Sequence, residues 1–282
     1  MVTSPLSTAE AARRAVADQL TELRRNAEIT KRELSARCGW HEAKSSRIEA
    51  VKTAPSDADI RAWCAACGAP DQAADIIAAS RTAESMYVQW RRRHSAGMRK
   101  AQEDVLPRYE STQAFRIYCS NVMPGVLQTA PYATELMEMI TQFQGTPNDI
   151  EEAVQARTER ARALYQGNHT FAILLEEAVL RYRLGTAEAM AGQLGHLLSV
   201  MSLPSVSLGV IPSLAKRTMW PLEAFYLFDN QLVIVETLTA EVKITTPTEA
   251  QDYIKAFGEL SKSAVYGTAA RTLITAAIDV LG

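Results

Sequence analysis

The sequence predicts a mainly α head of five helices, followed by a larger α+β domain with a small, mainly antiparallel sheet. A length of 282 residues suits two domains better than one. Apolar residues recur at helical spacing through the first third of the chain, whereas runs rich in β-branched and aromatic residues lie in the remainder. We place the head at residues 7–80, a helical connector at 81–110 and the second domain at 111–282.

Five helices are expected in the head. Apolar residues spaced by three and four predict the first helix over residues 7–26. Thr30 and Glu33 have the spacing of a capping box, so a short second helix should begin there and end near Gly39. The remaining three are expected at about 42–50, after the Pro-Ser-Asp cluster at 55–57, and from about 71 to 94.

The second domain alternates between the two periodicities. Asp229-Asn230 between two apolar runs predicts a hairpin turn. Helical periods cover 129–143, 149–165, 186–201, 248–261 and 268–281, and strand-like runs cover 170–175, 205–211, 224–228 and 232–238.

Charge is distributed unevenly along the chain. Residues 1–100 contain 17 Lys and Arg against 12 Asp and Glu, while the remainder contains 13 against 20. A basic head on an acidic body suits a protein of which only the head meets phosphates. The N-terminal residues lack the pattern of a signal peptide and no apolar run is long enough to span a membrane, so we expect a cytoplasmic protein with no membrane contact.

The stretch TKRELSARCGWHEAKSSRIEAVKTAPS at residues 30–56 resembles the Cro and phage-repressor (Xre) class of helix-turn-helix domains. The resemblance implies that the second helix of the motif enters the major groove of double-stranded DNA. It implies base-facing positions at Glu42, Ala43, Lys44 and Ser46, and roles at phosphates or in bracing the fold for Lys31, Arg47 and Lys52. Thr30, the polar residue that opens the first helix of the motif, completes the set of DNA-binding candidates. A purely structural role is the alternative at each position, as for Glu49, which can pair with a neighbouring cation.

Three residues depart from the pattern of that class. Glu42 stands where the class has Gln, Ser45 where it has a branched apolar residue, and Val51 where it has Gly. An acidic side chain at the leading edge repels phosphate unless it accepts from a cytosine amino group. These departures predict weak binding or an unusual specificity.

Beyond the head, several segments resemble the C-terminal domain of the WhiJ-like regulators of actinobacteria. They are MPGVLQTAPYA at 123–133, EEAVLR at 176–181, VSLGVIP at 206–212, the segment 221–225 and Glu236 at the end of a strand. The resemblance implies a transcription regulator that is often paired with a small protein encoded beside it, an arrangement likened to toxin–antitoxin systems.

Candidate partner- or ligand-binding residues in this domain form two groups. Pro124, Gly125 and Gln128 predict a sharp turn that feeds a helix. Aromatic side chains supply large contact areas at low entropic cost, which makes Tyr132, Trp220 and Phe225 candidates for a recognition surface. A role in folding or in the core is the alternative for all six.

Metal binding and catalysis are not expected. Cys38 with His41 and Cys64 with Cys67 have the spacing of zinc ligand pairs, but these cysteines lie on apolar sides of their helices and suit a core. The phosphate-cradling, nucleophile-elbow and metalloprotease motifs are all absent from the sequence. The chain is therefore expected to be no enzyme and to need no cofactor.

The sequence as a whole predicts a regulator that binds its operator as a homodimer, on two half-sites about one helical turn apart. We expect its second domain to bind a small protein encoded nearby. The alternative is a small-molecule sensor with an apolar pocket between sheet and helices.

Overall fold

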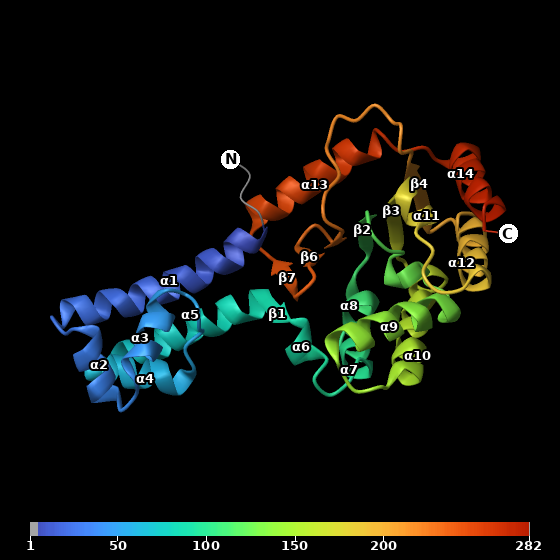
Figure 1. The fold of residues 1–282 in the computed structure, drawn as a ribbon. Helices are drawn as coiled ribbons and strands as arrows, with labels where there is room; N and C mark the ends of the chain where they lie inside the picture. Colours follow the sequence, from blue (N-terminus) through green and yellow to red (C-terminus); the bar gives the residue numbers. More distant parts are fainter. Residues whose placement is uncertain (1–4, 282) are drawn as a thin grey trace. The chain divides into compact units, whose positions relative to one another are not determined.

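The computed structural model describes the backbone of residues 5–281, together with their side chains except at 5–10, 82, 84–89, 91 and 92. The chain forms two compact units, residues 1–88 and 89–282, which are coloured from blue to teal and from teal to red in Figure 1. Of the connector predicted at residues 81–110, residues 89–110 belong to the second unit.

The first unit is the predicted helical bundle. Its helices are α1 (Pro5–Asn26), α2 (Lys31–Cys38), α3 (Glu42–Glu49), α4 (Asp57–Ala66), the short 3₁₀ helix η1 (Pro70–Gln72) and α5 (Ala73–Met86). The prediction of one helix from 71 to 94 is wrong in extent. The chain leaves the helical conformation at β1 (Tyr87–Gln89) and resumes it for one turn in α6 (Trp90–Arg93).

Side chains at the helix starts explain why these short helices form. Thr30 and Glu33 make the predicted capping box at α2, and Ser56 and Asp59 make a second one at α4. Each box satisfies backbone N–H groups that a helix leaves unpaired at its first turn. Gly39 ends α2 in the left-handed conformation, with φ at 71°.

An apolar core holds the first unit together. Trp63 lies at its centre, fully buried, and its indole Nε1 donates to the carbonyl of Leu20 at 2.8 Å. The other buried members are Val16, Leu20, Ile29, Leu34, Ile48, Ile60, Cys64, Ala73, Ile76 and Ile77. All five α-helices of the bundle contribute to this core, whereas η1 does not. The core fixes α2 and α3 against a rigid support.

The second unit is the predicted α+β domain. Its strands are β2 (Ala114–Cys119), β3 (Thr170–Glu176), β4 (Val206–Ile211), β5 (Phe225–Phe228), β6 (Leu232–Glu236) and β7 (Ala240–Ile244). Its helices after α6 are α7 (Arg99–Glu103), α8 (Leu106–Ser111), η2 (Gly125–Leu127), α9 (Ala130–Gln144), α10 (Ile150–Arg160), η3 (Ala161–Leu164), α11 (Glu177–Arg181), α12 (Ala187–Val200), α13 (Pro247–Ser261) and α14 (Gly267–Asp279).

The strands of this unit follow the order β7-β6-β5-β2-β3-β4. The pairs β2–β5, β5–β6 and β6–β7 are antiparallel, which confirms the prediction of a mostly antiparallel sheet. The pairs β2–β3 and β3–β4 are parallel. Parallel strands need covering helices on both faces, which explains the uninterrupted apolar run of β3.

Alternate residues of the sheet serve two different faces. On one face, Phe225 packs edge-on against Tyr253 of α13, with ring centroids 5.0 Å apart. On the other face, Phe115 and Phe171 stack with centroids 4.3 Å apart inside the main core of the unit. Tyr226, next to Phe225 in β5, points to this second face, where helices α6 to α10 also contribute side chains.

The hairpin turn predicted at Asp229-Asn230 is present, with φ at 48° and 59°. The turn residue Asp229 also makes hydrogen bonds to the start of β2. Asp229 Oδ1 accepts from the backbone N–H groups of Gln113 and Ala114 at 3.0 and 2.7 Å, and the Asp229 N–H donates to the carbonyl of Ala114 at 3.0 Å. Within residues 5–281, no helix has the length and apolar character needed to cross a membrane.

Candidate functional site

Helices α2 and α3 form a helix-turn-helix pair. Three residues separate them, and Trp40 closes the turn by donating its backbone N–H to Ser35 at 3.0 Å. His41 opens α3 as its N-cap, with Nδ1 accepting from the N–H of Ala43 at 3.2 Å. This geometry places the second helix so that its outer face is free to enter a groove.

Ser45, one of the departures from the family pattern, is fully buried between the two helices. Its Oγ lies 2.5 Å from Oγ of Ser35, which is also buried, and accepts from Nε1 of Trp40 at 2.9 Å. A branched apolar residue would join the helices by packing alone. Here a hydrogen-bonded polar cluster does so, and the departure therefore belongs to the support of the motif and not to its outer face.

Lys31 and Glu49 belong to a second cluster that braces three helices. Glu49 accepts from Nε of Arg24 at 2.6 Å and pairs with Nζ of Lys31 at 2.9 Å, which ties α3 to α1 and α2. Burial raises the pKa of Glu49, but the hydrogen bonds from Arg24 and Lys31 outweigh it and leave the pKa below its ordinary value. The structure thus gives Lys31 a bracing partner.

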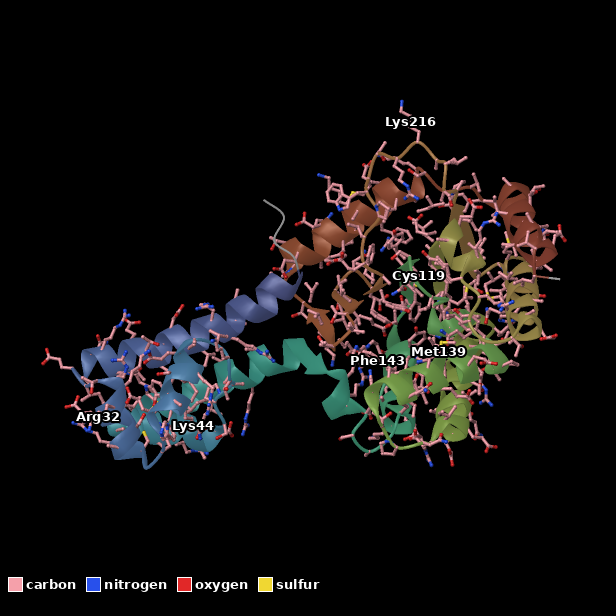
Figure 2. The ribbon with its side chains drawn as sticks, in the orientation of Figure 1. Arg32, Lys44, Cys119, Met139, Phe143 and Lys216 are labelled. Carbon is pink, nitrogen blue, oxygen red and sulfur yellow. The ribbon has the colours of Figure 1, made fainter. Side chains whose placement is uncertain are left out.

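Lys44 has a similar internal partner. Its Nζ lies 2.5 Å from Oδ1 of Asp59 in α4 and 4.6 Å from the ring centroid of Trp40. Because the ammonium group is held by a carboxylate and an aromatic face, it is less available to base edges than the sequence suggests. Lys44 is labelled on the first unit in Figure 2, as is the exposed Arg32 of α2.

The outer face of α3 consists of the other predicted positions. Glu42, Ala43 and Arg47 are exposed and Ser46 is half-buried, while Lys52 is exposed just beyond the helix. Thr30 is exposed at the start of α2. Ala43 and Arg47 are four residues apart, so they share one side of the helix. The structure therefore brings this set together around α3 and its ends.

Val51 stands in a conformation that suits glycine. Its φ is 58°, in the left-handed region, where a β-branched side chain is strained. The residue follows the end of α3, and its N–H donates to the carbonyl of Ile48 at 3.0 Å. The backbone has thus kept the shape for which the class uses glycine.

The cysteines of the first unit pack as small apolar side chains. Cys64 is buried, and Cys38 and Cys67 are half-buried against the same core. Burial raises the pKa of Cys38 to about 11, so its thiol stays protonated at neutral pH. Among the described residues, no three His, Cys, Asp or Glu side chains form a group that could hold a metal ion.

In the second unit, Gln128 connects the turn at 123–125 with α10. Its Nε2 donates to the carbonyl of Met123 at 2.7 Å, and its Oε1 accepts from Nη1 of Arg157 at 2.7 Å. Pro124 is buried and Gly125 is half-buried; a Cβ on Gly125 would lie 3.2 Å from Nη2 of Arg160. These residues support a cluster of arginines.

The three aromatic candidates are not together. Tyr132 is buried, and its hydroxyl accepts from the N–H of Met123 at 3.2 Å. Phe225 is buried on the α13 face of the sheet, with its ring 5.4 Å from that of Tyr118. Trp220 is exposed in the loop before β5. Tyr132 and Phe225 therefore have the positions of core residues.

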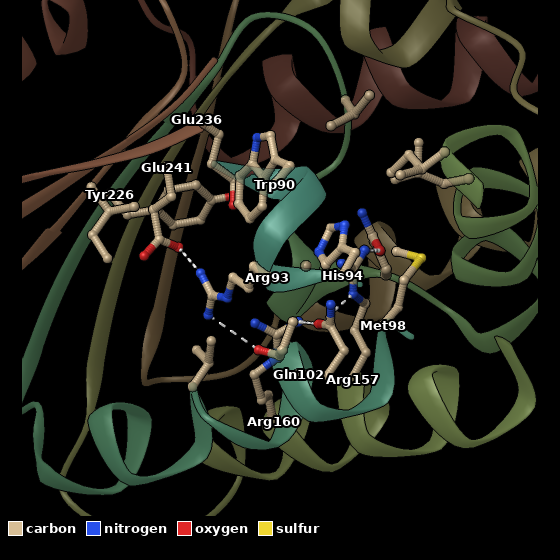
Figure 3. Close-up of a pocket in the computed structure, with 18 of the residues that line it drawn as sticks. Trp90, Arg93, His94, Met98, Gln102, Arg157, Arg160, Tyr226, Glu236 and Glu241 are labelled. Atoms are coloured by element: carbon tan, nitrogen blue, oxygen red, sulfur yellow. Dashed lines mark hydrogen bonds and ion pairs between the residues drawn. The ribbon is translucent and has the colours of Figure 1, made fainter. Parts of the chain in front are cut away.

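A cavity of about 540 Å³ lies between the second sheet face and helices α6 to α10. Its arginines and glutamates come from five elements, α6, α8, α10, β6 and β7. Figure 3 shows Arg93, Arg157, Arg160, Glu236 and Glu241 among them. No single segment of the sequence contains enough of them to form a motif. Arg157 and Arg160 carry the one local signal, since both occupy largely apolar, inward positions of an amphipathic helix.

Arg93 of α6 lines the cavity through an ion pair. It is paired with Glu241, with Nη1 and Oε2 2.5 Å apart, and donates to the carbonyl of Ala101 at 3.2 Å. The side chains of Arg91 and Arg92 lie outside the described residues.

Comparison with known families gives two matches. Residues 15–75 match a helix-turn-helix domain family, and residues 104–276 match a family described as Domain of unknown function (DUF5753). Comparison with curated proteins gives no match. The first match supports the prediction of an Xre-type regulator head. The second covers more than half of the sequence, and the chain therefore belongs to the DUF5753 family, with a helix-turn-helix domain in front.

Proposed function

We propose that the chain is a sequence-specific DNA-binding transcription regulator. The observation that carries the proposal is the outer face of α3. There Ala43 and Arg47 are exposed and Ser46 is half-buried, on a helix whose inner side is fixed by Ser45 and Ile48. A rigid helix with an exposed polar face is what groove recognition requires. No catalytic reaction is assigned to the chain.

Binding to its own promoter fragment tests this proposal. Full-length protein is titrated against that fragment and against a scrambled one, across a series of salt concentrations. Specific binding that weakens as salt rises is expected, because phosphate contacts release counterions. Equal binding to both fragments at every salt concentration would contradict the proposal.

For the second domain, we propose that it binds a small partner protein encoded beside the gene, as the likeness to WhiJ-like, antitoxin-like regulators implies, and that the regulator acts as a homodimer. Co-expression of the two genes followed by size-exclusion chromatography tests both points. A stable complex and a dimeric mass are expected. A monomer that never co-elutes with the neighbouring gene product argues against both.

The cavity favours a second candidate, in which the same domain senses a small molecule. Its volume of about 540 Å³ lies within the range of small-ligand sites, and it combines apolar walls with a few charged groups. A ligand of this kind would stabilise the chain without any added protein. Thermal unfolding with candidate ligands separates this possibility from partner binding.

A further inference from the structure

The cavity contains an excess of positive charge. Of the described side chains that line it, four are arginines (Arg93, Arg108, Arg157 and Arg160) and two are glutamates. Glu236 and Glu241 are opposite each other on β6 and β7, and Arg93 is paired with Glu241. Burial lowers the pKa of His94, which therefore adds no charge at neutral pH. The remaining three arginines outnumber the other glutamate of the lining, Glu236, and leave the cavity cationic.

These three arginines are close together and poorly neutralised. Arg157 Nε and Arg160 Nη2 donate to the same acceptor, Oε1 of Gln102, at 3.1 and 2.5 Å. Burial and the charge of Arg160 lower the pKa of Arg157 to about 10. The amide oxygen of Gln102 already receives two donors, so it cannot satisfy the cluster further.

Two guanidinium groups have donors to spare. Arg160 is only 8% exposed, and its buried Nε has no hydrogen-bond partner. Arg108 makes no hydrogen bond or ion pair through its side chain within the described part of the chain; its guanidinium lies 5.3 Å from the ring centroid of Phe228. The Arg160 guanidinium lies 5.6 Å from the ring of Tyr109, which is itself 6.0 Å from Phe228. Both guanidinium groups thus lie beside the same pair of aromatic rings, Tyr109 and Phe228.

The lining of the cavity also includes exposed apolar side chains. Met139 and Phe143 are four residues apart on α9 (Figure 2), and both are exposed, Phe143 by 72%. Leu238, after β6, is also exposed. A cationic lining that also has apolar side chains suits a molecule with both characters.

We propose that this cavity binds a small organic anion, a carboxylate or phosphate ester with an apolar chain or ring, whose acidic group meets Arg108 and Arg160 and whose apolar part lies along α9. Guanidinium groups match the planar fork of a carboxylate and the oxygens of a phosphate. The anion fills the free donors and reduces the repulsion among the arginines. This inference deepens the sensor alternative of the proposed function and rests on it.

Isothermal titration of the full chain with octanoate, monooctyl phosphate, 1-naphthoate and the neutral control 1-octanol tests the proposal. Saturable binding is expected for at least one of the three anions, and about tenfold weaker binding for octanol. If none of the anions binds saturably, or if octanol binds as tightly as they do, the proposal is overturned.

Two matched variants locate the site. Arg108→Gln removes a cation that has no hydrogen bond to lose, and should weaken anion binding about tenfold or more while leaving the unfolding midpoint nearly unchanged. Arg162→Gln removes an exposed arginine two residues beyond Arg160 and outside the cavity, and should change nothing. Equal affinities in the two variants overturn the assignment to this cavity.

Operator binding is measured on the same samples, so that failure of the regulator proposal can be distinguished from failure of the anion-binding proposal. Anion binding without specific DNA binding contradicts the regulator proposal alone. Specific DNA binding without anion binding contradicts the present inference alone.

Discussion

The hydroxyl oxygens of Ser35 and Ser45 lie 2.5 Å apart, both buried, at the point where the two helices of the helix-turn-helix motif cross. Ser45 also accepts from the indole of Trp40, so one side chain serves α2, the turn and α3. The contact explains how a serine replaces the branched apolar residue usual at this position.

Replacing Ser45 alone should therefore be costly. Ser45→Ala leaves the Trp40 indole N–H and the Ser35 hydroxyl without their partner, and we expect a loss of about 1–3 kcal/mol of unfolding free energy. The double variant Ser35→Ala with Ser45→Val removes both hydroxyls and restores apolar packing, so it should recover part of the loss. Urea unfolding measures both; a double variant no more stable than Ser45→Ala would contradict this explanation.

Relief of strain at Val51 should stabilise the first unit. A left-handed conformation costs a β-branched residue about 1–2 kcal/mol, and glycine loses part of this gain through its greater flexibility when unfolded. Val51→Gly is therefore expected to raise the free energy of unfolding by about 0.5–1 kcal/mol. Val51→Ala keeps a Cβ at the same φ of 58° and is the control, with a smaller gain.

Acid should weaken the first unit through Glu49. Its folded-state pKa is lowered, so its contribution is complete above the unfolded-state pKa and is lost as the pH falls through the folded-state value. The protection factors of the amides in α1 to α3, corrected for the pH dependence of intrinsic exchange, should therefore fall below about pH 4.5.

The variant Glu49→Gln should lose about 2 kcal/mol at pH 7 and respond less to acid. Glu42→Gln is its matched control. Glu42 is exposed on the same helix and makes no ion pair within the described residues, so its variant should keep the acid response of the parent protein. If Glu49→Gln kept the same acid response as the parent protein, carboxylates other than Glu49 would control the loss of stability in acid.

Arg47 and Lys44 should differ in their effects on DNA binding. Arg47 is exposed, so Arg47→Ala should weaken operator binding and lower the salt slope by about 1, with the fold intact. Lys44 is paired with Asp59, so Lys44→Ala should lower the stability as well as the affinity. Equal salt slopes in the parent and Arg47→Ala would exclude a phosphate contact by Arg47.

Much of the first unit could be predicted because its signals are local. The capping box of Thr30 and Glu33 and the glycine at the turn each lie within a few residues, and the structure confirms both. The partners of Lys31 and Lys44 could not be predicted, because Glu49 and Asp59 come from other helices.

The second unit was predicted less completely. The hairpin β5–β6 and strands β3 and β4 have dense apolar runs, but β2 and β7 were missed. β2 contains Arg116 and β7 contains Glu241 and Lys243, and these charges interrupt the apolar pattern of short strands. The arginine cluster was also missed, because it forms only when α8, α10 and the sheet come together.

The contact between Asp229 and the start of β2 also decides which side chains reach the arginines. It sets the pairing in which Ile117 faces Tyr226 and Tyr118 faces Phe225. Strand residues alternate strictly, so an offset of one position would turn Tyr226 toward α13 and Phe225 toward the cavity. One carboxylate in a tight turn thus determines which side chains of β5 point to each face of the sheet. Insertions of an even number of residues in β5 should be tolerated better than insertions of an odd number.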